Sequence, residues 1–324
     1  MKLVAPLARA APPDRAAWDA LLGASRGVSV FHTASWAELW TAEWRDARWE
    51  AIVLEDGNGY TGAIGAIVRR RGVARAVYSM PYGTYGGPIV REDHPDPASA
   101  RRLLFEGYAR LAGGRLSLRS ELTWYEGALD ELPAGLRPQE AFTHVLPLGR
   151  DYEAVAGGFA PATRRLVRQA EESGLAIRAA ETLDDVRFFY DLAVETARRR
   201  GGRPKPHSLY VRIFERLVPA GVARYHLVLH GDRPVAGSLH LFHEGVATNW
   251  LPVSTEAAWN LRPNNFLISR VLKSLCAAGY LEYQFGASPL DAAGLIRFKE
   301  GWGAKQRPLV IAGSRSALHQ RLRV

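Results

Sequence analysis

Basic side chains gather in two stretches of the sequence, where they could bind an anionic ligand such as a phosphate or an RNA backbone. Arg164 and Arg168 lie about one turn apart in a predicted helix and therefore share a face. A solvated helix face would explain this pair equally well. The second stretch runs from Arg198 to Tyr210, and its Pro and Gly residues predict a loop rather than a helix. Loops commonly carry binding groups, so Lys205 and His207 are candidate ligand contacts.

The histidines and the cysteine of this sequence do not form a pattern typical of a metal site or of a covalent nucleophile. His240 and His243 lie three apart in a predicted strand, so their side chains point to opposite faces of the sheet. Cys276 is the single cysteine, and it falls on the apolar face of a predicted helix, which favours packing over nucleophilic attack. We therefore expect chemistry without a metal and without a cysteine nucleophile.

Composition predicts an ordinary globular protein of about two domains, because 324 residues are roughly twice the usual domain length. Apolar residues make up 47% and the net charge is +9, which makes polyanions candidate ligands: tRNA, a nucleotide-linked substrate or an anionic membrane face. A basic surface with no such ligand is the alternative. The sequence starts without the apolar stretch of a signal peptide, and no window is long enough to span a bilayer. We expect a cytoplasmic protein, with peripheral membrane contact at most.

Each half of the sequence predicts a mixed α/β unit. In the first half, Asp56-Gly57-Asn58-Gly59 supplies the turn of a hairpin, and helical spacing relates Trp36 to Trp40. The predicted helices are 34–44 and 97–111, and the predicted strands are 49–56, 60–70, 74–80, 115–119 and 141–148. In the second half the predicted helices are 162–172, 183–200 and 263–279, with strand 175–179, a three-stranded meander over 223–253 and a last strand at 280–286.

An internal echo predicts that the two halves share one fold. LEDGNGYTGAIGAIV and LHGDRPVAGSLHLF each place a polar turn before a strand that contains glycine. The halves are expected to meet near Leu148 to Asp151, where LPLGRD interrupts the pattern. This gives a first domain over residues 1–149, to which the C-terminal tail 312–324 could return, and a second over 150–311.

The stretch from Asn249 to Leu309 resembles the FemAB-like aminoacyltransferases and the related acetyltransferase domain of the GNAT superfamily. It reads NWLPVSTEAAWNLRPNNFLISRVLKSLCAAGYLEYQFGAS and then GLIRFKEGWGAKQRPL. Shorter stretches agree in the family's order: FHTASW, YGTYGGPIV, TRRLVRQAEESGL and ETARRRGGRPKPHSLY. The resemblance implies two GNAT-like domains of class α/β (α+β), each a mixed, largely antiparallel sheet flanked by helices, with the substrate cleft between or along them.

The resemblance also implies a reaction. Family members transfer an aminoacyl group, usually from aminoacyl-tRNA, to an amine of a peptidoglycan precursor. Two alternatives stay open: N-acyl transfer from acyl-CoA to a small amine, polysaccharide or protein, and a non-catalytic module that binds tRNA or a membrane. No bound cofactor is expected, since tRNA or CoA would act as the carrier of a co-substrate.

Lys299 is the predicted catalytic residue. It matches the family lysine that stabilises developing negative charge or the acceptor's carboxylate and phosphates, and amide formation from an ester needs such stabilisation of an oxyanion. An exposed surface lysine is the alternative. The resemblance further implies that Tyr210 contacts the acceptor's phosphates, with Lys205 or His207 as its basic partner. The residues assigned to substrate binding are Phe298, Tyr210, Lys205, His207, Arg164, Arg168, Tyr85 and Trp250.

The donor is assigned to the start of the helix at 263–279. A conventional GNAT protein holds the CoA pyrophosphate with a basic residue and closely spaced glycines at a helix N-terminus. Arg262, Asn264 and Asn265 occupy that place here, but there is no glycine pair and Pro263 lacks an N–H group. CoA is therefore the weaker donor hypothesis.

Overall fold

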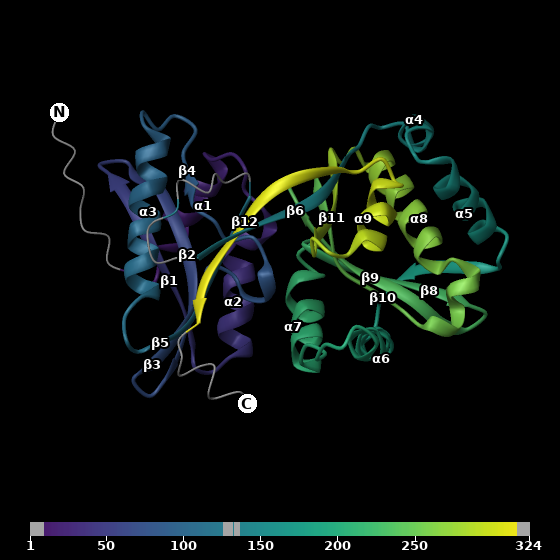
Figure 1. Cartoon of the computed structure of the whole chain (residues 1–324), viewed down its shortest axis with the longest axis horizontal. Coiled ribbons are helices and arrows are strands. Elements are labelled where there is room, and N and C mark those ends of the chain that lie inside the picture. Colours follow the sequence, from purple (N-terminus) through teal and green to yellow (C-terminus); the bar gives the residue numbers. More distant parts are fainter. Residues whose placement is uncertain (1–9, 126–131, 133–136, 316–324) are drawn as a thin grey trace. The chain divides into compact units, whose positions relative to one another are not determined.

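The computed structural model describes residues 10–125, 132 and 137–315, and these residues form two compact units. The first unit contains residues up to 142 and those from 308 onward, and the second unit contains residues 143–307. The chain passes from the first unit to the second within strand β6 (Arg137–Pro147), and it returns within strand β12 (Lys305–Arg315) (Figure 1). Each unit contributes its own run of adjacent strands and has its own buried core.

In the first unit the strand order is β1-β2-β3-β5-β12, with β4 beside β2. The strands are β1 (Ala47–Asp56), β2 (Gly59–Arg71), β3 (Ala74–Tyr78), β4 (Ile89–Val90) and β5 (Ser117–Tyr125). Only the pairing of β3 with β5 is parallel among the described pairs of this unit. The helices are α1 (Arg15–Gly23), α2 (Ala34–Glu43) and α3 (Pro97–Ala112), with short 3₁₀ turns η1 (Val30–His32) and η2 (Pro81–Gly83).

The second unit has the strand order β6-β11-β10-β9-β8-β7. Its strands are β7 (Leu175–Ala179), β8 (Ala223–His230), β9 (Arg233–His243), β10 (Val246–Ser254) and β11 (Glu282–Ser288), together with the end of β6. Its helices are α4 (Tyr152–Gly157), α5 (Pro161–Glu171), α6 (Leu183–Arg199), α7 (His207–Leu217), α8 (Pro263–Ala278) and α9 (Ala293–Glu300), with a 3₁₀ turn η4 (Glu256–Leu261). Helix α8 covers one face of β8 to β10, and α6 and α7 cover the other (Figure 1).

The prediction of a loop from Arg198 to Tyr210 is wrong at both ends, because α6 continues to Arg199. The non-helical segment ends at Pro206, and α7 begins at His207. Leu209, Ile213 and Leu217 recur at helical spacing and are buried, so the apolar face of α7 packs while its start follows proline directly. Helices α1 and α9 were also not predicted from the sequence, although α9 carries Lys299.

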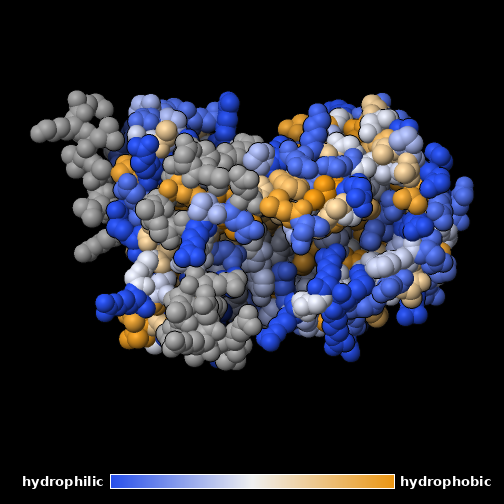
Figure 2. Space-filling view, viewed as in Figure 1, coloured by the Kyte–Doolittle hydropathy of each residue, from blue (hydrophilic) through white to orange (hydrophobic). Residues whose placement is uncertain are grey.

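The surface on the visible face is mostly hydrophilic, with hydrophobic side chains gathered around β11 (Figure 2). Leu281 and Leu290, which flank β11, are exposed. None of the helices in the described part of the chain combines the length and apolar character that crossing a bilayer requires.

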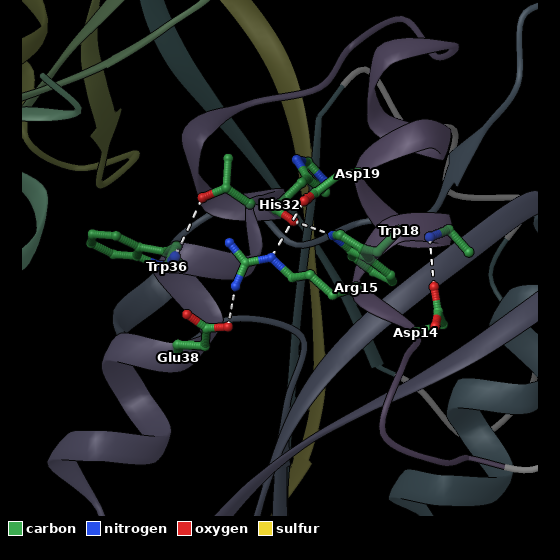
Figure 3. A network of polar contacts seen from close by, with 9 residues as sticks. Asp14, Arg15, Trp18, Asp19, His32, Trp36 and Glu38 are labelled. Carbon is green, nitrogen blue, oxygen red and sulfur yellow. Dashed lines mark hydrogen bonds and ion pairs between the residues drawn. The ribbon is translucent and has the colours of Figure 1, made fainter. Parts of the chain in front are cut away.

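Helices α1 and α2 of the first unit are joined by an arginine. Arg15 pairs with Asp19 on its own helix and with Glu38 on α2 (Figure 3). Beneath this exposed contact, the buried Trp18 indole N–H donates to the carbonyl oxygen of His32 over 2.8 Å. The side-chain bridge and the buried hydrogen bond together fix α1 on the η1–α2 segment.

Candidate active site

Strands β10 and β11 part after three residues. Along most of its length β10 pairs with β9, but it pairs with β11 only where Val246–Thr248 meets Glu282–Gln284. The register of β10 against β9 shifts between Asn249 and Leu251, which marks a bulge at the point of separation. We call the separated segments, 249–254 of β10 and 285–288 of β11, the fork. Backbone groups that leave a ladder need other partners, so the fork is a place where a ligand can bind.

Lys299 lies at the fork. Its side chain comes from α9 and is only 4% exposed, and its ammonium group donates to the carbonyl oxygens of Gly286 (2.6 Å) and Ala287 (3.0 Å). Successive carbonyls of a regular strand point in opposite directions, but Gly286 has φ +75°, which breaks the alternation and lets both reach one ammonium. An ammonium has three N–H groups, and within the described residues two of them have an acceptor.

Arg200 acts electrostatically on two lysines. Burial, and secondly the Arg200 guanidinium, lower the pKa of Lys299 to about 8. The same two causes lower the pKa of Lys205 to about 8, and the Lys205 ammonium lies 5.3 Å from the centroid of the Trp250 ring on β10. Three cationic groups therefore influence one region of the second unit, which we call the cation cluster. A bound anion would relieve their mutual repulsion and their loss of solvation.

His144, on β6, is a fully buried neighbour of Lys299 that sequence reasoning did not identify. Burial first, and then the Lys299 charge, lower the pKa of His144, while Glu300 raises it. The imidazole is therefore neutral at pH 7 and adds no further positive charge beside Lys299.

Of the predicted site residues, Lys205 lies over the ring of Trp250, and Arg200 acts electrostatically on both Lys205 and Lys299. Arg200 was visible in the sequence only as part of a basic run. The paired carbonyls of Gly286 and Ala287 had one signal, a glycine inside a strand pattern, which commonly marks a bulge or a close backbone approach.

Two residues predicted to contact the acceptor lie on α7. Tyr210 is 2% exposed, with its ring near those of Phe189 and Tyr190, and its carbonyl oxygen accepts from the Tyr225 hydroxyl. His207 is exposed at the start of the helix, edge-on to the ring of Tyr190. The phenol of Tyr210 is therefore part of the packed face of α7.

The remaining predicted substrate contacts make other interactions within their own units. Arg164 donates to the carbonyl oxygens of Gly157 and Phe159, so it ties α5 to the end of α4. Arg168 is exposed on α5, and Phe298 packs against the core of the second unit. Tyr85 belongs to the first unit, where it is buried against the rings of Phe31 and Tyr125.

The predicted donor residues lie at the start of α8. Arg262 has φ +58° and precedes Pro263, the first residue of the helix. The Asn264 side-chain amide donates to the Ser254 hydroxyl at the end of β10 over 3.4 Å, and Asn265 is buried. The start of α8 is therefore tied to the end of the fork strand β10. In the described residues no three His, Cys, Asp or Glu side chains gather closely enough to hold a metal ion.

Residues 158–300 match the family model described as an acetyltransferase (GNAT) domain. The matched range includes the fork, the cation cluster and Lys299. No match is found among curated protein sequences.

Solved structures share the fold of nearly the whole chain. FemX is 14% identical with a TM-score of 0.69, and the match covers 97% of this chain and 99% of FemX. L-PGS from Bacillus licheniformis is 15% identical with a TM-score of 0.57 and 95% coverage of both chains. A tandem GNAT protein from the clavulanic acid biosynthesis pathway is 14% identical with a TM-score of 0.53, covering 92% of this chain and 95% of that one. The predicted α/β fold of GNAT type is confirmed, and with the matched domain the chain is an acyltransferase.

Proposed function

We propose that this acyltransferase forms an amide bond by passing an aminoacyl group from aminoacyl-tRNA to an amine of a peptidoglycan precursor. The observation that carries the proposal is the burial of Lys299 at the fork, with two of its N–H groups held by backbone carbonyls and the third left for a substrate. The FemAB-like sequence of this region and the fold shared with FemX support the same reaction.

The amine attacks the ester carbon of the donor, and negative charge grows on the carbonyl oxygen as the C–N bond forms. Lys299 donates its remaining N–H to that oxygen and stabilises the charge within a region from which water is largely excluded. The C–O bond of the ester then breaks, and the departing oxygen takes the proton lost by the amine and leaves as a hydroxyl group. His144 is neutral, so it places no further positive charge beside Lys299 during these steps.

The cation cluster binds the phosphates of the substrates. Arg200 and Lys205 lie where an anion would offset their loss of solvation, and an anion also raises the pKa of Lys299 and Lys205 again. Both lysines are then protonated at physiological pH. Trp250, beneath the Lys205 ammonium, provides the apolar wall beside this site.

Acyl transfer from acyl-CoA is the second candidate. The matched family model describes an acetyltransferase domain, and the start of α8 lies beside the end of the fork, where a helix N-terminus can bind phosphate. Arg262 and Asn264 would serve the pyrophosphate in that case. Pro263 removes one of the N–H donors, which is why we rank this donor second.

The donor is tested directly by mass spectrometry of the products. The purified chain is incubated with a UDP-linked muropeptide and either a mixture of charged tRNAs or acetyl-CoA. We expect the muropeptide to gain the mass of one amino-acid residue with charged tRNA, and no acetyl group with acetyl-CoA. Acetylation alone would replace the proposal by the second candidate. If neither donor gives a product, the remaining interpretation is a non-catalytic binding module.

A melting experiment supports the assignment without requiring turnover. A ligand that binds only the folded state raises the melting temperature by mass action. We expect stabilisation by the UDP-linked muropeptide, and a smaller effect in the Lys205→Met variant. Stabilisation of both proteins to the same extent would place the muropeptide phosphates elsewhere.

A further inference from the structure

Ser288, the last residue of β11, has a buried hydroxyl that no interaction within the described residues explains. The side chain is 4% exposed, and its Oγ has no hydrogen-bond partner there. Ser288 directly follows Ala287, whose carbonyl oxygen accepts from the Lys299 ammonium. Covalent geometry keeps Oγ within roughly 5 Å of that carbonyl oxygen. The hydroxyl therefore lies in the immediate neighbourhood of Lys299.

Three other buried serine hydroxyls in the second unit are paired. Ser238 donates to the Asn249 side chain, Ser269 shares a hydrogen bond with the Tyr152 hydroxyl, and Ser254 accepts from the Trp259 indole. A buried hydroxyl without a partner lowers stability, so it is commonly satisfied by a bound molecule or serves a function. Ser288 lies at the fork, where a bound acyl donor would supply the missing partner.

We infer that the Ser288 hydroxyl is a second hydrogen-bond donor to the acyl carbonyl oxygen, beside the remaining N–H of Lys299. The inference rests on the proposed function only in needing an acyl donor at the fork, and an ester or a thioester would serve. Two donors from different elements, β11 and α9, fix the direction of the carbonyl as well as its charge. Ser288 makes and breaks no covalent bond: the amine attacks the carbonyl carbon, and the hydroxyl only donates to its oxygen.

Ser288→Ala tests the inference because activity should fall without any loss of stability. Removing an unsatisfied buried hydroxyl leaves the melting temperature unchanged or raises it, whereas the loss of one oxyanion donor lowers kcat by about tenfold or more, with a smaller change in KM. Ser117→Ala is the matched control, because Ser117 is also buried with an unpartnered Oγ but lies on β5 of the first unit. Its melting temperature should respond in the same way, with kcat unchanged.

Ser288→Cys provides a second variant that keeps the side-chain shape while replacing a strong donor by a weak one. It should also lower kcat, because the weaker donor stabilises the oxyanion less. Normal kcat in Ser288→Cys and Ser288→Ala would overturn the inference. So would a melting temperature several degrees below that of the wild type, because the hydroxyl would then have a structural partner.

Running both donors separates this inference from the proposed function. If the wild type uses only acetyl-CoA, aminoacyl transfer fails as the function, and Ser288 is judged by kcat with acetyl-CoA. If charged tRNA is used and Ser288→Ala is normal, only the inference fails. If neither donor is turned over, both the proposed function and the inference about Ser288 fail.

Discussion

The two units bury different kinds of side chain. The large, fully buried side chains of the first unit are mostly rings, among them Trp18, Trp36, Trp40 and Tyr108. Both units bury titratable side chains, but the most deeply buried ones lie in the second unit: His144 and His240 have no exposed surface and Lys299 has almost none, whereas His32 and Glu50 of the first unit are each 7% exposed. Burying such groups costs stability unless they are paired, so their concentration in one unit indicates where function has been favoured over stability.

A chain of polar groups runs through the core of the second unit beneath α8. The Nδ1 atoms of His226 and His240 are 3.0 Å apart, and His240 Nε2 lies 3.0 Å from the Tyr283 hydroxyl. Burial lowers the pKa of His226 to about 4 and moves the pKa of His240 in the same direction, so both rings are neutral at pH 7. The chain ends on β11 next to the residues that begin the fork, whereas the core of the first unit beside α3 is mainly apolar.

Lys299→Met should give the largest effect. Methionine keeps much of the stem and its apolar contacts but removes the charge, so turnover should fall by roughly a hundredfold, the order that the loss of one oxyanion donor costs. Stability should change little, because the variant loses two hydrogen bonds but no longer buries an ammonium group. Steady-state kinetics and thermal melting measure the two effects.

Lys273→Met is the matched control, because Lys273 is exposed on α8 and its replacement should leave turnover unchanged. Lys299→Arg should not fully restore activity, since a planar guanidinium cannot satisfy the same pair of carbonyls and the same substrate oxygen. Near-normal turnover of Lys299→Met would remove the main support of the mechanism.

Gly87→Ala tests the first unit by packing alone. An added Cβ would lie 2.2 Å from Cδ1 of Trp124, so the core must shift, and overpacking of this kind lowers stability by about 1–3 kcal/mol. Denaturant unfolding measures the loss. Gly23→Ala, which meets nothing within 4 Å, is the control and should not be destabilised. Equal stability of the two variants would contradict the close contact at Gly87.

Asp185→Asn tests a buried charge that is paired. The carboxylate accepts from Arg178 and from the backbone N–H groups of Glu181 and Thr182 at the start of α6, and the hydrogen bond from Arg178 is the main reason that its pKa is lowered. The variant should lose about 1–2 kcal/mol at pH 7. Because the folded pKa is depressed, this stabilisation is present above the unfolded value near 4 and is lost as the pH falls below it.

Unfolding of the two proteins at pH 7 and at pH 3 measures this dependence. The difference in stability between wild type and Asp185→Asn should shrink at the lower pH. A difference that stays constant with pH would mean that Asp185 acts through its shape and not through its charge.

The regular elements were predictable wherever local signals agreed. The turn at Asp56 to Gly59, strand β7 and helix α8 lie where turn residues, alternation and helical spacing place them. The start of helix α7 was not predicted, because the Pro and Gly residues before it indicated a loop that continued to Tyr210. The last predicted strand was 280–286, whereas β11 runs from Glu282 to Ser288, beyond a glycine that would ordinarily end a strand, and β12 was not predicted.

The site was predictable only in part. The resemblance identified Lys299, but the sequence could not tell whether its ammonium is exposed or buried, because that depends on where α9 packs against β11. The two carbonyls of Gly286 and Ala287 reach one ammonium because of one backbone angle, and the Ser288 hydroxyl is buried without a partner among the described residues. Features of this kind arise from tertiary contacts that no local pattern encodes.

Lys205→Met should give the smallest effect and the one most sensitive to conditions. The variant removes one charge of the cation cluster but keeps apolar contact with Trp250, so muropeptide affinity should fall by roughly five- to tenfold at low ionic strength, and by less as salt screens the charge. Lys305→Met, at an exposed position, is the control and should bind as the wild type does. Because the pKa of Lys205 is lowered to about 8, the wild type should lose affinity as the pH rises through 8, and the variant should lose less. Calorimetric titration with the UDP-linked muropeptide at two pH values and two salt concentrations measures all of these effects. If the variant keeps the wild-type affinity and pH dependence at low salt, Lys205 lies outside the phosphate site, and only Arg200 and Lys299 remain to bind the anion.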